Sequence, residues 1–178
     1  MSRSGGVAGE VARLTGLSVR EARVVGAQHG YQHLMITLSG GRRAFAKAIP
    51  APDHAAAPDH VAGAFAAEAN SLRWLGEAAA VPIPEVLAVG PQVLVISMIP
   101  PGRATPEAAF QFGTELARLH AAGAAGFGAP WPGFIASLPL DNTLDTGDWP
   151  QWYADRRLLP FLSRAAMTGA AAPSRSST

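Results

Sequence analysis

The spacing of apolar and polar residues predicts a β-hairpin near the amino end of the chain. Residues 31–38 (YQHLMITL) and 43–49 (RAFAKAI) are typical of strands, and residues 39–41, which contain two glycines, are typical of a tight turn between them. Successive strand residues point to opposite faces of a sheet, so Lys47 shares a face with Phe45. The pattern therefore places a lysine on the face that holds the large apolar residues.

A second pattern predicts a helix over residues 61–80. Its apolar side chains, among them Phe65 and Leu72, recur at the 3.6-residue period of a helix. Glu68 falls inside this apolar stripe, and a buried ammonium such as that of Lys47 needs a partner because an unpaired one is costly. We therefore expect Lys47 and Glu68 to pair between the sheet and the helix. The alternative is that Glu68 reaches solvent from the edge of the stripe.

Two further strands and a capped helix follow. Residues 86–89 and 93–99 are short apolar runs typical of buried strands, and a rigid Pro-Pro-Gly segment leads from them to the helix. Thr105 stands at the cap position of that helix, with Pro106 at its first position and Gly123 at its end. The order of elements indicates an α+β fold, in which an antiparallel sheet with a helix precedes a helical region.

This order is similar to that of the small lobe of protein-kinase-like enzymes, followed by the first helices of a large lobe. Those enzymes keep an ion pair between a strand lysine and a helix glutamate, and Lys47 and Glu68 occupy the corresponding places. We expect four segments along the chain: an amino-terminal helical segment at 1–24, a nucleotide-binding small lobe at 25–99, a hinge with the start of a helical large lobe at 100–162, and a disordered tail at 163–178.

Composition and charge exclude several classes of protein. The chain has 14 basic and 13 acidic residues and no cysteine, so it has no disulfide framework, thiolate zinc site or cysteine nucleophile. Its basic residues form no patch longer than a pair, which argues against a nucleic acid partner. No apolar stretch is long enough to span a membrane, and the amino end lacks the apolar core of a signal peptide. We therefore expect no membrane association and a cytoplasmic location.

The one lysine of the chain, Lys47, stands among 13 arginines. Lysine carries a compact charge on a thin stem, which suits a phosphate or a buried carboxylate better than a planar guanidinium does. The residue type at this position therefore favours a functional role for Lys47.

Six motifs in order resemble the fructosamine kinases, which are relatives of the aminoglycoside phosphotransferases. The resemblance runs from about residue 25 to residue 162. The motifs are GRRAFAKA at 41–48, FAAEANSLRWL at 65–75, VPIPEVLAVG at 81–90, FGTELARLHAAGAAGFGAPW at 112–131, FIASLPLDNT at 134–143 and DWPQWYADRRLLPFL at 148–162.

The resemblance implies ATP-dependent phosphorylation of a sugar hydroxyl on a ketosamine, either a small molecule or a glycated protein lysine. It implies that Lys47 binds the α- and β-phosphates of ATP and that Glu68 holds Lys47. It further implies that Ile96 borders the adenine pocket and that the backbone of Ser97 and Ile99 reads the adenine edge. ATP and Mg²⁺ are the cofactors expected for the family.

The sequence also departs from the family pattern. The turn that covers the phosphates has two separated glycines, Gly26 and Gly30, with His29 beside the second, and Ser97 stands where the family usually has glutamate. The family's catalytic loop, which begins His-Gly-Asp, and its later metal-binding aspartate have no counterpart. We therefore expect a chain truncated before that loop, with no catalytic residue and no metal ligand, and inactive by itself.

Two other functions are compatible with these residues. The chain could be a non-catalytic fragment that binds a nucleotide or a partner, or a different small-molecule kinase of the aminoglycoside phosphotransferase group. Asp141 and Asn142 either order the substrate side or form a structural turn. Self-association is expected if apolar side chains stay uncovered; those concerned are Phe110, Phe112, Leu116, Trp131, Trp149 and Phe161.

Overall fold

The computed structural model describes residues 4–50, 59–135 and 138–169. The chain forms two compact units, Met1–Gly123 and Ala124–Thr178. The first contains an antiparallel sheet with helices, and the second contains a small two-stranded sheet and helices. The predicted α+β class is therefore confirmed.

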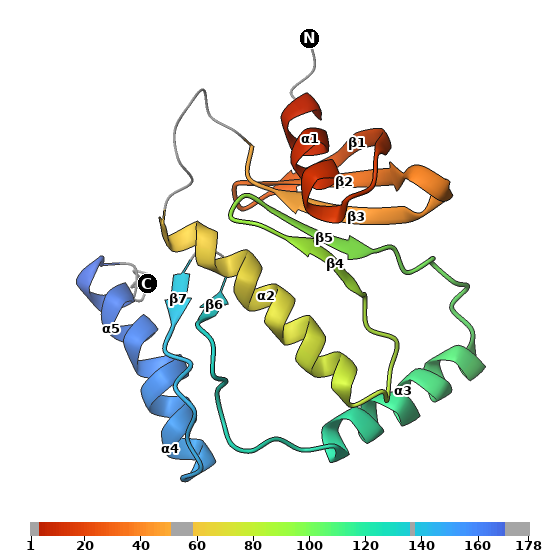
Figure 1. The fold of residues 1–178 in the computed structure, drawn as a ribbon. Coiled ribbons are helices and arrows are strands. Elements are labelled where there is room, and N and C mark those ends of the chain that lie inside the picture. The colour runs from red at the N-terminus through yellow and green to blue at the C-terminus, as the bar shows by residue number, and fades with distance from the viewer. Residues whose placement is uncertain (1–3, 51–58, 136–137, 170–178) are drawn as a thin grey trace, which may run out of the picture. The chain divides into compact units, whose positions relative to one another are not determined.

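The first unit is built on a five-stranded antiparallel sheet with strand order β1-β2-β3-β5-β4 (Figure 1). The strands are β1 (Val19–Gln28), β2 (Tyr31–Leu38), β3 (Arg43–Ala48), β4 (Val86–Val89) and β5 (Val93–Ser97). The predicted hairpin is confirmed, because β2 and β3 pair antiparallel around a turn at Ser39–Gly41. Gly40 and Gly41 have φ angles of 78° and 81°, a conformation that glycine adopts without the strain of a side chain.

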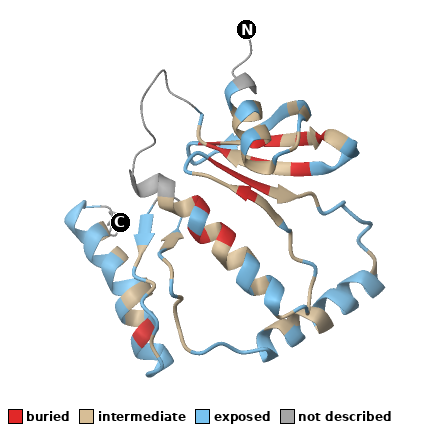
Figure 2. Ribbon diagram, viewed as in Figure 1, coloured by how far each residue is buried: buried red, intermediate tan, exposed pale blue. Residues whose placement is uncertain are grey.

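Helices α1 (Ser4–Thr15) and α2 (Asp59–Glu77) pack on opposite faces of this sheet (Figure 1). In the first unit, the buried positions concentrate on the strands of the sheet and on the first half of α2 (Figure 2). The larger buried cluster includes one residue of α1 and consists of Val11, Leu34, Ile36, Leu38, Ala44, Ala46, Ala48, Ala88, Val93 and Val95. The smaller cluster lies on the α2 side and consists of Tyr31, Phe65, Ala69 and Leu94.

Strand β3 presents alanines, rather than Lys47, to the larger cluster. Ala44, Ala46 and Ala48 are each 0% exposed, and Lys47 points to the other face, where the smaller cluster lies. Lys47 therefore shares a face with Phe45 and Ile49, as the alternation predicts, and that face is the less buried one of β3. The three alanines belong to the same buried cluster as Val11 of α1, whereas the large residues of β3 lie on the less buried face.

The amino-terminal helix is shorter than expected. Helix α1 ends at Thr15, and residues 19–24 belong to β1 instead of the predicted helical segment. Gly16 has a φ of 70°, the left-handed conformation that commonly ends a helix. The following residues pair with β2 along most of its length, so they form the edge strand of the sheet.

Helix α3 (Pro106–Ala121) follows the proline-rich connector and begins as predicted. The Thr105 side-chain oxygen accepts a hydrogen bond from the Ala108 amide at 3.2 Å, and Pro106 is in the first turn. Gly123, with a φ of 71°, follows the helix end. Within the ranges that the structure describes, no helix is long and apolar enough to cross a bilayer.

The second unit places two short strands beside a run of helical turns. These elements are β6 (Gly133–Ile135), β7 (Leu138–Leu140), α4 (Trp149–Tyr153), the π-helical turn η2 (Ala154–Leu158) and α5 (Leu159–Met167). A backbone bridge joins Phe127 to Asp145. Gly128 allows the chain to approach this segment, since a Cβ atom there would lie 2.7 Å from the carbonyl oxygens of Asn142 and Thr143.

The carboxyl-terminal tail differs from the expectation of disorder from residue 163. Residues 163–167 continue α5, which ends before Gly169 in the left-handed conformation with a φ of 72°. Residues 170–178 lie outside the described part of the chain. The helix extends further because the alanines of this segment are strong helix formers.

Candidate functional site

Lys47 and Glu68 form an ion pair that joins β3 to α2. The Lys47 Nζ atom lies 2.6 Å from the Glu68 Oε2 atom. The side chains are 26% and 38% exposed, respectively, so the pair is reachable from solvent. The predicted pairing is confirmed, and the alternative of a Glu68 side chain directed to solvent is excluded.

Lys47 belongs to a row of paired residues that crosses the sheet. Gly26 in β1 pairs with His33 in β2, His33 pairs with Lys47, and Lys47 pairs with Leu94 in β5. Residues directly opposite each other in an antiparallel pair share a face, so His33 lies on the same side of the sheet as Lys47. The sheet thus brings together two of the predicted residues, Gly26 and Lys47, around a histidine that sequence reasoning missed.

Tyr31 contacts this pair from the start of β2. The centroid of the Tyr31 ring lies 5.3 Å from the centroid of the Phe65 ring in α2. The Lys47 Nζ atom lies 5.9 Å from the Tyr31 centroid. Burial, together with the negative charge of Glu68, raises the pKa of the Tyr31 hydroxyl above its usual range. Among the described residues, the Tyr31 hydroxyl is the buried side-chain polar atom that has no hydrogen-bond partner.

The predicted phosphate-covering turn is a tight hairpin turn of two residues. Gln28 in β1 pairs with Tyr31 in β2, so only His29 and Gly30 lie between the strands. Their φ angles of 52° and 81° are both positive, as type I′ turns require. Gly26 belongs to β1 rather than to the turn, because the strand pairing continues to the last residue before His29.

The three residues predicted to lie beside the adenine occupy β5 and the connector after it. Ile96 is partly buried and packs against the smaller cluster. The Ser97 amide donates to the Glu85 carbonyl at 2.8 Å, and the Ser97 hydroxyl oxygen accepts from the Glu85 amide at 2.9 Å. No hydrogen bond within the described residues engages the amide of Ile99, whose side chain is 45% exposed.

Helix α3 exposes part of the apolar surface that the sequence predicts. Phe110 is 79% exposed and Phe112 is 55% exposed. An open groove of about 650 Å³ runs along α3 beside Phe110. Of the other residues named for this surface, Trp149 is exposed and Leu116, Trp131 and Phe161 are partly buried.

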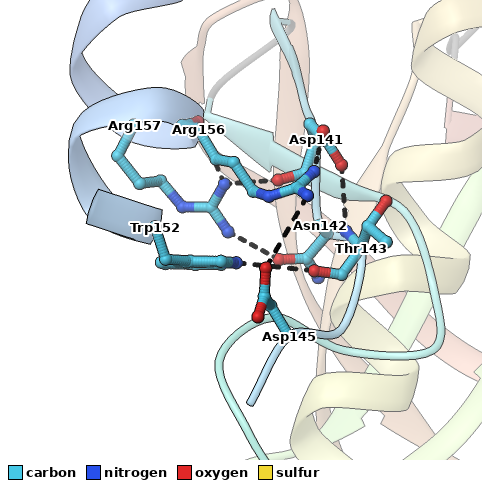
Figure 3. Close-up of polar contacts among 7 residues, drawn as sticks. All are labelled: Asp141, Asn142, Thr143, Asp145, Trp152, Arg156 and Arg157. Carbon is cyan, nitrogen blue, oxygen red and sulfur yellow. Dashed lines mark hydrogen bonds and ion pairs between the residues drawn. The ribbon is translucent and has the colours of Figure 1, made fainter. Parts of the chain in front are cut away.

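A polar cluster in the second unit surrounds Arg157, and we call it the Arg157 cluster (Figure 3). The Arg157 guanidinium donates to the Asp141 carbonyl at 2.5 Å and to the Asn142 Oδ1 atom at 2.7 Å. It also lies 4.3 Å from the ring centroid of Trp152, which is buried. Burial lowers the pKa of Arg157, and the charge of Asp141 opposes that shift.

Asn142 ties the loop after β7 to the rest of the second unit. Its Nδ2 atom donates to the Trp131 carbonyl at 3.0 Å while its Oδ1 atom accepts from Arg157. Trp152 donates to the Thr143 carbonyl at 3.5 Å. Of the two interpretations of Asp141 and Asn142, these contacts favour a structural turn.

An open pocket of about 290 Å³ in the second unit is lined by several carboxylates. Asp141 contacts the Arg156 guanidinium and accepts from the Thr143 amide, and the amide contact is the first cause of its lowered pKa. Asp145 accepts from the Gly147 amide, and Asp155 accepts from Gln151. Across the described ranges, no group of three or more acidic or histidine residues could hold a metal ion.

The family comparison identifies what these elements are similar to. The model of the family described as "Fructosamine kinase" matches residues 19–177, which is longer at both ends than the resemblance seen in the sequence motifs. "Probable ketoamine kinase YniA" of Escherichia coli strain K12 is 32% identical to the chain over 112 residues. That alignment covers 60% of this chain and 39% of the relative, and the protein of the same name in Escherichia coli O157:H7 matches equally.

Solved structures share the arrangement of elements. The crystal structure titled "putative fructosamine-3-kinase" from Thermobifida fusca YX-ER1 superimposes with a TM-score of 0.86 at 41% identity, over 97% of this chain and 57% of that one. A second, with the same description, from Haemophilus somnus 129PT gives a TM-score of 0.72 at 16% identity, which shows a shared fold. The chain thus spans little more than half the length of either structure.

Proposed function

Because the chain belongs to the fructosamine kinase family, we propose that its first unit binds ATP. The Lys47–Glu68 ion pair carries this proposal, since it joins a sheet strand to a helix and both side chains stay partly exposed. Lys47 binds the α- and β-phosphates, and Glu68 fixes the position of the ammonium. A half-exposed pair contributes little to stability, so its better explanation is the positioning of a charge for a ligand.

The neighbouring elements supply the other contacts of the nucleotide. The His29–Gly30 turn covers the phosphates. Gly26, in the strand that leads to this turn, has no side chain that would block the approach of the phosphates. Ile96 borders the adenine. The Ile99 amide and the Ser97 carbonyl form hydrogen bonds with the edge of the adenine base. The amide of Ile99 suits this role because no described residue uses it, whereas the amide of Ser97 already donates to Glu85.

The reaction of the whole protein is phosphorylation of a sugar hydroxyl on a ketosamine, including ketosamines on glycated protein lysines. ATP supplies the phosphoryl group in that reaction. The described residues do not fit a magnesium site, because no cluster of three acidic or histidine side chains is found among them. The sequence also contains no His-Gly-Asp, so we propose that this chain binds ATP without transferring its phosphoryl group. The ketosamine substrate and a cytoplasmic location remain predictions.

Calorimetric titration with ATP, with and without magnesium, tests the proposal. Lys47→Ala and Glu68→Gln should weaken ATP binding by about tenfold or more, since a hydrogen bond to a charged group is worth about 1.5–3 kcal/mol. Arg13→Ala is the matched control, because it breaks an exposed ion pair with Glu10 on α1. Equal ATP affinity in the parent and Lys47→Ala proteins would contradict the proposal.

A transfer assay uses the same proteins with a fructosamine or ribulosamine substrate and labelled ATP. We expect phosphorylated product at background in the parent chain and in Lys47→Ala. Product that forms with the parent chain and is lost in Lys47→Ala would show that one of the aspartates acts as a base. In that case ATP binding would stand and the proposed inactivity would be wrong.

Self-association of this chain is a second candidate, favoured by the exposed Phe110 and Phe112 side chains on α3. Apolar surface of this kind is typical of interaction sites. Sedimentation velocity over a range of concentrations should show a second copy bound, and Phe110→Ser should reduce the associated fraction. A monomer at every concentration would contradict this candidate.

A further inference from the structure

The hydroxyl of Tyr31 is buried without a hydrogen-bond partner. Tyr31 is 8% exposed, and among the described residues its hydroxyl is the buried side-chain polar atom that lacks a partner. Buried polar groups in folded proteins almost always have partners, because an unmade hydrogen bond leaves the cost of desolvation without compensation. We therefore expect the Tyr31 hydroxyl to gain a hydrogen-bond partner in another state of the protein.

Both members of the ion pair act on Tyr31. The Lys47 ammonium lies 5.9 Å from the centroid of the ring, within the range of a cation–π contact. Burial and, after it, the negative charge of Glu68 raise the pKa of the Tyr31 hydroxyl, so the hydroxyl keeps the proton that it would donate. Phe65, one helical turn before Glu68, packs against the same ring with centroids 5.3 Å apart and holds it against α2.

Glu68 has a single partner within the described part of the chain, the Lys47 ammonium at 2.6 Å. When Lys47 is drawn to a phosphate, its charge is shared between two anions. The Glu68 carboxylate can then accept a further hydrogen bond, because the Lys47 ammonium is its one hydrogen-bond donor among the described residues. A phenol hydroxyl is a suitable donor to a carboxylate.

We propose that Tyr31 is a positioning residue whose hydroxyl donates a hydrogen bond to the Glu68 carboxylate when Lys47 engages the phosphates of a bound nucleotide. This inference rests on the proposed ATP binding and adds a third residue to it. Tyr31 follows the His29–Gly30 turn directly, so the same residue connects the turn over the phosphates with α2. Nucleotide binding and the placement of α2 are thereby coupled through one side chain.

The variant Tyr31→Phe removes the hydroxyl and keeps the ring. It should weaken ATP binding by about tenfold in calorimetry, the size expected for loss of one hydrogen bond to a charged group. It should leave the melting temperature of the free protein unchanged or raise it, because the hydroxyl has no partner there. Tyr153→Phe is the matched control: it makes the same change at the other tyrosine, which is 41% exposed in the second unit.

A double-mutant cycle separates positioning from a general structural role. Glu68→Gln should weaken ATP binding, and adding Tyr31→Phe to it should cost less than Tyr31→Phe costs alone. As a second measurement, tyrosine labelled with ¹³C at Cζ gives one resonance for each of the two tyrosines, assigned with Tyr153→Phe. The Tyr31 resonance should shift on addition of ATP in the parent protein, and by less in Glu68→Gln.

Each outcome decides the inference. Parent-like ATP affinity in Tyr31→Phe overturns it and leaves the proposed ATP binding intact. Additive losses in the cycle also overturn it, since they mean that the hydroxyl affects ATP binding independently of Glu68. Failure of the parent protein to bind ATP, or parent-like binding by Lys47→Ala, overturns the proposed function as well.

Discussion

The two units hold their inward-facing cations in different ways. In the first unit, Lys47 has one carboxylate partner, Glu68, and its side chain is 26% exposed. In the second unit, Arg157 donates to a backbone carbonyl and a side-chain amide and stacks on Trp152.

The difference follows from the two side chains. A guanidinium has five donors in a fixed plane, so it can bond several groups of the protein at once and stack on a ring. An ammonium is a compact charge on a flexible stem, and it can exchange one anion for another. The comparison therefore supports a structural role for Arg157, and it agrees with the proposal that Lys47 binds a ligand.

The largest effect is expected from Arg157→Ala. It removes three hydrogen bonds and the stacking contact and leaves the Asn142 amide oxygen without its donor. The free energy of unfolding should fall by about 2 kcal/mol, the size expected when hydrogen bonds from a partly buried charged group are lost. Denaturant unfolding followed by tryptophan fluorescence measures it.

Arg156→Ala is the control for that experiment. Among the described residues, Arg156 forms ion pairs with the exposed carboxylates of Asp141 and Asp145, so its loss should change stability by less than about 1 kcal/mol. Equal destabilisation by both variants would contradict the distinction between a stacked arginine and a surface ion pair.

A smaller effect on stability is expected from Lys47→Ala. The pair with Glu68 is partly exposed, so the free energy of unfolding should change by less than about 1 kcal/mol. The same variant should bind ATP more weakly. A large loss of ATP affinity with a small change in stability is the result expected for a cation that binds a ligand. A loss of stability as large as that of Arg157→Ala would make Lys47 a structural residue and remove the difference between the two units.

The smallest effect concerns the pH dependence contributed by Asp141. Its pKa in the folded chain lies below the ordinary value of 3.8, because the Thr143 amide and Arg156 favour the ionised form. A lowered pKa stabilises the fold above the unfolded value, and this contribution is lost as the pH falls through the folded pKa. Asp141→Asn should therefore be slightly less stable than the parent at pH 7, with the difference shrinking below pH 3.8. Melting curves between pH 2.5 and pH 7 measure it, and a difference that is constant across that range would contradict the assignment.

Local patterns predicted much of the first unit correctly. The hairpin, the cap at Thr105 and the pairing of Lys47 with Glu68 each depend on residues close in sequence or on a single polar exception in an apolar pattern. The alternation along β3 correctly placed Phe45 and Lys47 on one face, but it does not show which face of the sheet is more deeply buried. The Arg157 cluster was not predicted, since its members come from separate motifs.

The sequence by itself determined the β2–β3 hairpin, the helices α2 and α3, the family and the two residues of the ion pair, because periodicity and motif spacing can be read along the chain. Only the tertiary structure decided that alanines, not Lys47, face α1, that His29 and Gly30 alone form the turn, and that Tyr31 lies buried beside the pair. These outcomes depend on contacts between side chains distant in sequence, such as Tyr31 with Phe65. Packing of that kind depends on how elements dock, which no local pattern specifies.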